Sequence, residues 1–128
     1  MPAPTTFEIG ANLAGVVTLS SLGVVDPETR FNDYPASVRR QDGLTLGLGN
    51  PSATWRYGFL RKEQYDALRT YCPTMGAAVT IATINNDMEF VRYNCFMEMP
   101  TEFVLRNTDG RQVYIDVEIR FTGLVLAE

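Results

Sequence analysis

The chain has 128 residues, of which 45% are hydrophobic and 20% charged, and its formal net charge is −4. These values are typical of one soluble globular domain; they exclude intrinsic disorder and argue against a general affinity for nucleic acid. The first residues contain no basic segment followed by a long apolar run, so we expect neither a signal peptide nor membrane insertion. We predict a single domain over residues 1–128 with a loose N-terminus at 1–4.

The N-terminal third is predicted to contain short strands followed by one long loop. Residues 5–9 form a strand candidate, and 16–19 and 22–25 form two strand pieces or one kinked strand. The segment 26–36 contains two prolines and several turn-forming residues, so we predict a loop there. Two aromatic residues in this predicted loop pack either on the core or on a neighbouring subunit, namely Phe31 and Tyr34.

The middle of the chain is predicted to form a strand, a helix and a second strand. Residues 37–41 are a basic strand candidate before an Asp-Gly turn, and 44–51 form a weak strand or a flexible loop. Aromatic residues then alternate through 53–60, which indicates a half-buried strand. The spacing of Tyr65, Leu68 and Cys72 predicts one amphipathic helix over about residues 61–72, which Pro73 ends. Because the rest of the chain predicts strands or loops, this helix must cover a sheet.

Two hairpins are predicted in the C-terminal half. The first joins residues 77–83 to 88–95 through a polar turn at 84–87, and the second has its turn at 107–110, where a glycine favours positive φ. Strict alternation in the last strand predicts one buried face and one solvated face, the latter carrying Tyr114 and charged residues. The predicted core comprises Trp55, Tyr65, Leu68, Val113, Ile115, Val117, Ile119 and Phe121.

No set of catalytic residues stands out in the sequence. The chain has no histidine, which removes the commonest general base and excludes a Ser-His-Asp triad. Two cysteines are too few for a zinc site without histidine, and Cys72 and Cys95 are expected to be reduced core residues. Acidic residues in the C-terminal half offer carboxylates for glycoside hydrolysis, but no spacing selects a pair. We predict a protein that is not an enzyme and has no metal or cofactor.

Several residues are candidates for contacts between subunits. Ten of the eleven basic residues are arginine, which suits protein interfaces, although the base composition of the genome is an alternative explanation. Methionines near residue 97 are either adaptable contact residues or core filler. The predicted interface comprises Arg30, Phe31, Tyr34, Arg39, Arg40, Met97 and Met99.

The string VRRQDGLTLGLGNPSATWRYGFLRKEQYDAL, residues 38–68, resembles the distal-tail and minor tail proteins of long-tailed bacteriophages, which share the tail-tube fold. The matching features are basic residues before a DG turn, a TW-aromatic strand, and a short helix with acidic and aromatic residues before a leucine. The resemblance extends over about residues 37–124 through short motifs. One departure is Arg61, where such helices often begin with a serine or threonine cap.

The resemblance implies a mainly β protein, a two-sheet β-sandwich or barrel of the tail-tube type with one flanking helix. It further implies a six-fold ring of identical subunits, located in the virion tail and assembled in the host cytoplasm. The ring joins the tail tube to hub and tip proteins, and DNA only passes through its channel. An acidic lumen would repel the phosphates, and the candidate lumen residues are Asp87, Glu89, Asp116 and Glu118.

Other functions remain open from the sequence. Within the same superfamily, the chain could be the tail tube protein or a tail terminator. In a different class, it could be a carbohydrate- or receptor-binding β-sandwich in which Trp55, Phe31 and Tyr34 stack on a sugar.

Overall fold

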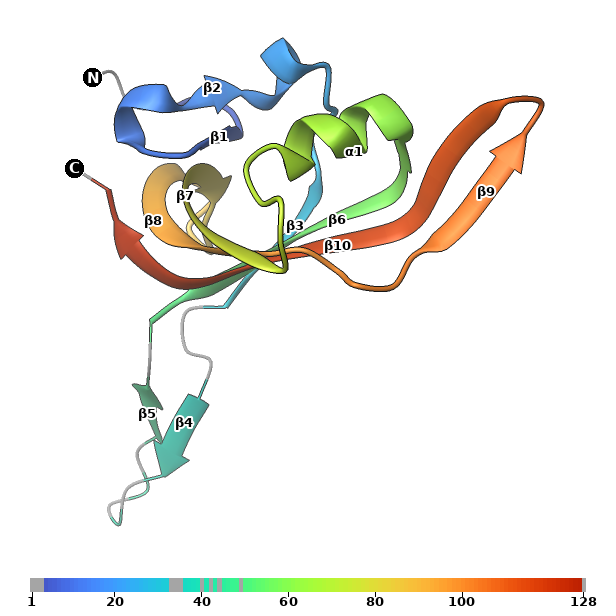
Figure 1. Cartoon of the computed structure of the whole chain (residues 1–128). Helices are drawn as coiled ribbons and strands as arrows, with labels where there is room; N and C mark the ends of the chain where they lie inside the picture. The colour runs from blue at the N-terminus through green and yellow to red at the C-terminus, as the bar shows by residue number, and fades with distance from the viewer. Residues whose placement is uncertain are drawn as a thin grey trace.

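The computed structural model describes residues 4–32, 36–39, 41, 43, 45–48 and 50–127, and Figure 1 shows how its elements are arranged. The described part of the chain is mainly β and contains a single α-helix, as the sequence predicts. In chain order the elements are β1 (Glu8–Gly10), the 3-10 helix η1 (Leu13–Gly15), β2 (Val17–Thr18), the 3-10 helix η2 (Leu19–Leu22), β3 (Glu28–Asn32), β4 (Ala36–Arg39), β5 (Thr45–Leu48), β6 (Ser52–Arg61), α1 (Lys62–Arg69), β7 (Gly76–Ile84), β8 (Phe90–Glu98), β9 (Val104–Thr108) and β10 (Arg111–Leu126).

One antiparallel sheet of eight strands organises the structure. Its order is β2-β1-β7-β8-β10-β6-β3, and β9 pairs with the first residues of β10. The longest strand, β10, therefore pairs with β8, β6 and β9. Among the described residues, β4 and β5 pair only with each other and form a separate two-stranded sheet, which projects from the rest of the molecule (Figure 1).

The eight-stranded sheet curls strongly. Strands β1 and β6 are four positions apart in the sheet, which would separate them by about 19 Å if the sheet were flat. Yet Phe7, beside β1, packs its ring 5.6 Å from the ring of Trp55 on β6. The indole N–H of Trp55 also donates a 3.0 Å hydrogen bond to Thr83 on β7. The core therefore lies inside the curl, with β1, β2 and α1 on the same side of the strands β6 and β10 (Figure 1).

Helix α1 covers part of this core. It begins one residue later than predicted, where the Gln64 side chain accepts a hydrogen bond from the Arg61 backbone N–H. It ends at Arg69, because the next residues form tighter turns before Pro73. Its buried face carries Tyr65 and Leu68.

Two predictions for the N-terminal third are wrong. The segment predicted as a loop at 26–36 contains the strand β3, which pairs with β6. Its alternate residues Thr29 and Phe31 are half-buried, and Phe31 lies 5.8 Å from the ring of Tyr93. Of the strand pieces predicted at 16–19 and 22–25, only β2 at Val17–Thr18 forms; the 3-10 helix η2 follows at Leu19–Leu22, where the side chains of Ser21 and Thr18 satisfy each other's backbone groups.

The buried face of β10 changes along the strand, which corrects part of the predicted core. Val117, Ile119 and Phe121 are buried, as are Trp55, Tyr65 and Leu68. Val113 and Ile115 are only half-buried and lie outside the core, whereas Tyr114, predicted to face solvent, packs 4.3 Å from the Tyr65 ring.

The buried face of β10 changes at Asp116, which lies between the two halves of the strand. Asp116 has a φ of 51°, and the register of the strand pair places it opposite Gly58 of β6. Strict alternation holds only for an extended backbone, so a left-handed residue interrupts it. On β6 the buried positions likewise pass from Tyr57 to Leu60, leaving Phe59 on the outside.

Candidate functional site

Apart from the β4–β5 hairpin, the structure has two regions, which we call the body and the arm. The arm consists of β9, residues 111–115 of β10 and residues 59–61 of β6; the body is the rest of the eight-stranded sheet with α1. Figure 1 shows the tip of the arm projecting on the side away from both chain ends. Its turn is formed by Asp109 and Gly110, both with positive φ, as in the tight hairpin turns that match strand twist. This hairpin agrees with the sequence prediction.

One face of the arm, which we call the arm face, presents apolar side chains to solvent. Strand pairing aligns Phe59, Ile115 and Val104 in one row across β6, β10 and β9. Phe59 is 57% exposed and Val104 is 62% exposed. Side chains directly opposite one another on paired strands lie about 5 Å apart, so the row forms a continuous apolar strip.

Arginines border this apolar strip. The next row places Val113 between Arg61 on β6 and Arg106 on β9, and Arg111 follows on β10. No ion pair joins these three arginines to any described residue. A depression of about 460 Å³ lies over this surface, lined by Gly58, Phe59, Arg106, Arg111, Val113 and Ile115. The arm face is therefore both apolar and strongly basic.

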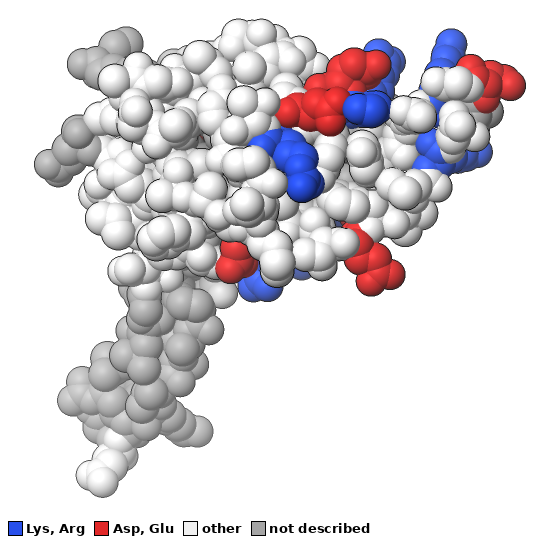
Figure 2. All heavy atoms as spheres, in the orientation of Figure 1, with Lys and Arg blue, Asp and Glu red and all other residues white. Residues whose placement is uncertain are grey.

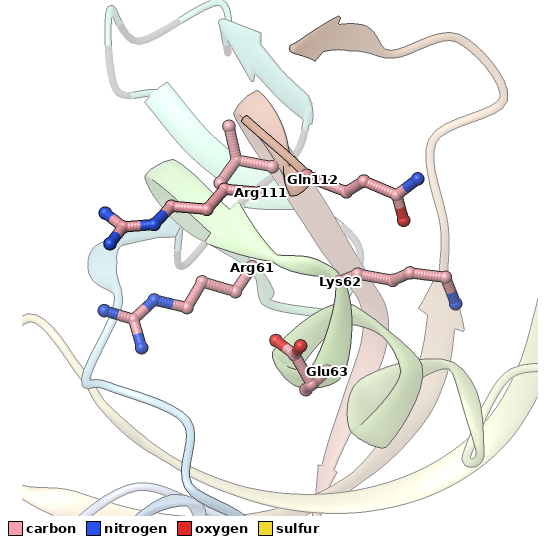
Figure 3. A pocket seen from close by; sticks show the side chains of 7 residues that line it. Arg61, Lys62, Glu63, Arg111 and Gln112 are labelled. Atoms are coloured by element: carbon pink, nitrogen blue, oxygen red, sulfur yellow. The ribbon is translucent and has the colours of Figure 1, made fainter. Parts of the chain in front are cut away.

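A second depression, of about 470 Å³, lies between the arm tip and the start of α1. In Figure 3 the side chains of Arg61 and Arg111 extend in the same direction, while Lys62 and Gln112 extend to the other side. Lys62 donates a 2.8 Å hydrogen bond to Asp66, and this contact raises the pKa of the lysine. Glu63 also lines the depression. Figure 2 shows that charged side chains on this side of the molecule gather over α1 and the arm.

The turn between β7 and β8 is the second exposed feature, and we call residues 85–89 the knob turn. Met88 at its end is 78% exposed. The side chain of Asn85 accepts hydrogen bonds from the backbone N–H of Asp87 (2.9 Å) and of Glu89 (3.2 Å). The backbone of Asn85 pairs with Met88 and Glu89 at 3.1 and 3.0 Å. The turn therefore holds an apolar side chain between two carboxylates.

The predicted interface residues do not form one surface. Arg30 is exposed on β3, and Phe31 is half-buried beside it. Arg39 belongs to β4, whereas Tyr34 and Arg40 lie outside the described residues. The interface prediction is wrong for Met97 and Met99, because both side chains are buried in the core of the chain itself and present no surface to a partner. Both belong to the hydrophobic core, which is the core-filler alternative that the sequence left open.

The predicted lumen residues occupy two separate places. Asp87 and Glu89 are exposed on the knob turn, beyond the end of β7. Asp116 and Glu118 are exposed on β10, where Asp116 forms a 3.2 Å ion pair with Arg56. They do not combine into a single acidic cluster.

Several polar groups are buried in the body. Burial raises the pKa of the Cys95 thiol to about 12 and also raises the pKa of Cys72. Burial, together with the charge of Asp26, raises the pKa of Tyr57, whose hydroxyl has no hydrogen-bond partner among the described residues. Trp55 is fully buried, so it offers no sugar-stacking surface, which corrects that part of the carbohydrate-binding alternative.

Neither the arm face nor the knob turn is directly indicated by the sequence. Phe59 and Ile115 read as core positions of alternating strands, and Met88 reads as the first residue of a strand. The two predicted hairpin turns, at 84–87 and 107–110, locate the strands in the sequence, but they do not indicate the direction of the side chains.

In the described ranges, no three His, Cys, Asp or Glu side chains come close enough to hold a metal ion. Within the same ranges, no helix is both long and apolar enough to cross a membrane. A scan against models of protein families finds no match to the chain, and searches of curated proteins and of solved structures also find no significant match.

Proposed function

We propose that this chain is a structural protein of a phage tail, which assembles into a ring that joins or continues the tail tube near the tail tip. The sequence supports the proposal because residues 38–68 resemble distal-tail and minor tail proteins. These residues belong to the elements β4, β5, β6 and α1. The mainly β composition with one helix is consistent with the proposal. Two alternative roles within the same superfamily are the tail tube protein and the tail terminator.

The observation that carries the proposal is the pair of hairpins that the body leaves uncovered. The β4–β5 hairpin has no other strand beside it among the described residues, and an isolated two-stranded hairpin is marginally stable in water. The arm adds a contiguous apolar strip at Phe59, Ile115 and Val104. Monomeric proteins rarely leave contiguous apolar patches exposed to solvent. Contacts with other subunits would therefore cover the apolar strip and stabilise both hairpins.

The finer architecture belongs to the same proposal. The curl of the sheet brings the β1–β7 end over β6, and this arrangement would give the two layers of a tail-tube-type sandwich or barrel. In a ring, the edges of the sheets would pair with neighbouring subunits, which removes unpaired strands from solvent. Exposed acidic residues such as Glu118 would line the channel and repel DNA in transit.

The partners in this proposal are further copies of the chain, the tail tube protein and the hub and tip proteins. The location is the virion tail, after assembly in the host cytoplasm. No residue is assigned a catalytic role.

Native mass spectrometry and negative-stain imaging of the purified protein test the proposal. We expect closed rings with six-fold symmetry, and we expect the protein in purified particles. A protein that stays monomeric at high concentration and is missing from particles would refute the proposal.

A further inference from the structure

The arm face and the knob turn have complementary chemistry. The arm face offers an apolar depression with arginines at its edge and no described acidic partner for them. The knob turn offers an exposed methionine between Asp87 and Glu89, and neither carboxylate forms an ion pair with a described residue. An apolar side chain flanked by carboxylates matches an apolar depression flanked by guanidinium groups.

The conformation of Met88 supports a role outside the folded chain. Its φ of 62° lies in the left-handed region, where glycine, asparagine and aspartate are favoured and a methionine is strained. With 78% of its surface exposed, the side chain contributes little to the core in return. The Asn85 hydrogen bonds hold the turn in one shape, so its docking would lose little conformational entropy.

The two features cannot meet within one chain. The arm lies at the start of β10, where Val113 pairs with Arg106 and Arg61. The knob turn lies beyond the other end of β10, where Leu126 pairs with Tyr93 near the start of β8. Fully extended, a strand of 16 residues would span about 50 Å; β10 bends, but the two features still lie at its opposite ends.

We propose that Met88 of one copy inserts into the arm-face depression of the next copy, with Asp87 and Glu89 beside Arg106 and Arg111. This interface is head-to-tail, because it joins two different surfaces, and such contacts generate rings when the rotation closes. The inference rests on the proposed function and specifies which surfaces form the ring. It also assigns Asp87 and Glu89 to the subunit contact rather than to the channel.

Charge reversal tests the polar half of the interface. The variant Arg111→Glu should weaken self-association at least tenfold in sedimentation velocity, because the carboxylate introduced at position 111 would face the carboxylates of the knob turn. The matched control is Arg120→Glu, an exposed arginine on the same strand in the body, which should leave association unchanged. The variant Glu89→Arg should weaken association as Arg111→Glu does.

Mixing the two defective variants gives a result that misfolding cannot mimic. Each retains one intact surface, and the two altered surfaces carry reversed, complementary charges. An equimolar mixture of Arg111→Glu and Glu89→Arg should therefore assemble when neither variant does so alone. Failure of the mixture to assemble would contradict the inference.

Disulfide trapping tests the apolar half. A chain carrying Met88→Cys, mixed with a chain carrying Val104→Cys and oxidised, should give a disulfide-linked heterodimer. The control is Leu105→Cys, which is adjacent and 70% exposed but lies on the other face of β9. The native cysteines are buried and should not compete.

The outcomes separate this inference from the proposed function. If the parent protein forms rings while Arg111→Glu assembles normally and trapping is equal at positions 104 and 105, the rings use another surface and this inference is wrong. If the parent protein stays monomeric at every concentration, both the proposed function and this inference fail.

Discussion

The two halves of β10 have similar sequences but different surroundings. In the body, Val117, Ile119 and Phe121 alternate with charged residues and are almost completely buried. In the arm, Val113 and Ile115 continue the same alternation, yet they are half-buried on an outer surface beside the exposed Phe59. The left-handed Asp116 between the two halves directs these arm side chains to the other face of the strand. Burial of an apolar residue therefore depends on which face its side chain reaches and on what covers that face. The difference indicates that the body supplies stability, whereas the arm supplies surface.

The largest contrast is expected between two phenylalanines. Phe121→Ala removes a fully buried ring that lies 4.6 Å from Trp55, and should lower the free energy of unfolding by about 3–5 kcal/mol. Phe59→Ala, on the arm, should change it by less than about 0.5 kcal/mol. Urea denaturation followed by Trp55 fluorescence measures both. Similar losses for the two variants would show that the arm is part of the core.

Two glycines give the next contrast. A Cβ at Gly10 in the body would lie 2.7 Å from the backbone of Gly15 and Val16, so Gly10→Ala should cost about 1–3 kcal/mol of folding free energy. Gly58, at the base of the arm, has open space around its Cα, and Gly58→Ala should be neutral or slightly stabilising. Thermal unfolding of both variants measures the difference. A stable Gly10→Ala variant would contradict the tight approach of β1 to the C-terminal end of η1.

Asp116, between the body and the arm, should tolerate only residues that accept a left-handed backbone. Asp116→Val places a β-branched side chain at a φ of 51° and should cost about 1–2 kcal/mol of folding free energy. Asp116→Asn loses the same exposed ion pair with Arg56 but tolerates the left-handed conformation, so it should cost under about 0.5 kcal/mol. Chemical denaturation distinguishes them. Equal effects would mean that the ion pair, not the backbone, matters at this position.

The smallest expected effect is a pH dependence of the free energy of unfolding, which arises from a buried thiol in the body. Burial raises the pKa of Cys95 from 9.0 to about 12 in the folded state, so the folded protein holds this proton more tightly than the unfolded chain. The resulting stability is fully present below pH 9 and is lost as the pH rises from 9 towards 12. We expect a loss of about 1 kcal/mol between pH 8 and pH 10 from this group. The loss should be smaller in Cys95→Ala, measured by urea unfolding at the two pH values.

Local signals in the sequence determined a substantial part of the structure. The period-3.6 spacing of Tyr65 and Leu68 located α1, because a helix buries one face whatever it packs against. The Asp109-Gly110 pair located the arm hairpin, because few residues accept positive φ. Alternation identified β10 and its buried residues from Val117 onwards.

Only the tertiary structure decided which faces are covered. The strand β3 exists because residues 28–32 pair with residues 52–56 of β6, a distant partner that no local pattern of the segment reveals. Met97 and Met99 are buried in the core, which their sequence pattern left open between core and interface. The side-chain directions in the arm depend on a single left-handed residue, Asp116, and aspartate is compatible with both an extended and a left-handed backbone. Periodicity and turn residues therefore determined α1 and the C-terminal hairpins, while long-range pairing and one backbone angle decided the strand β3 and the surface that we propose joins the subunits.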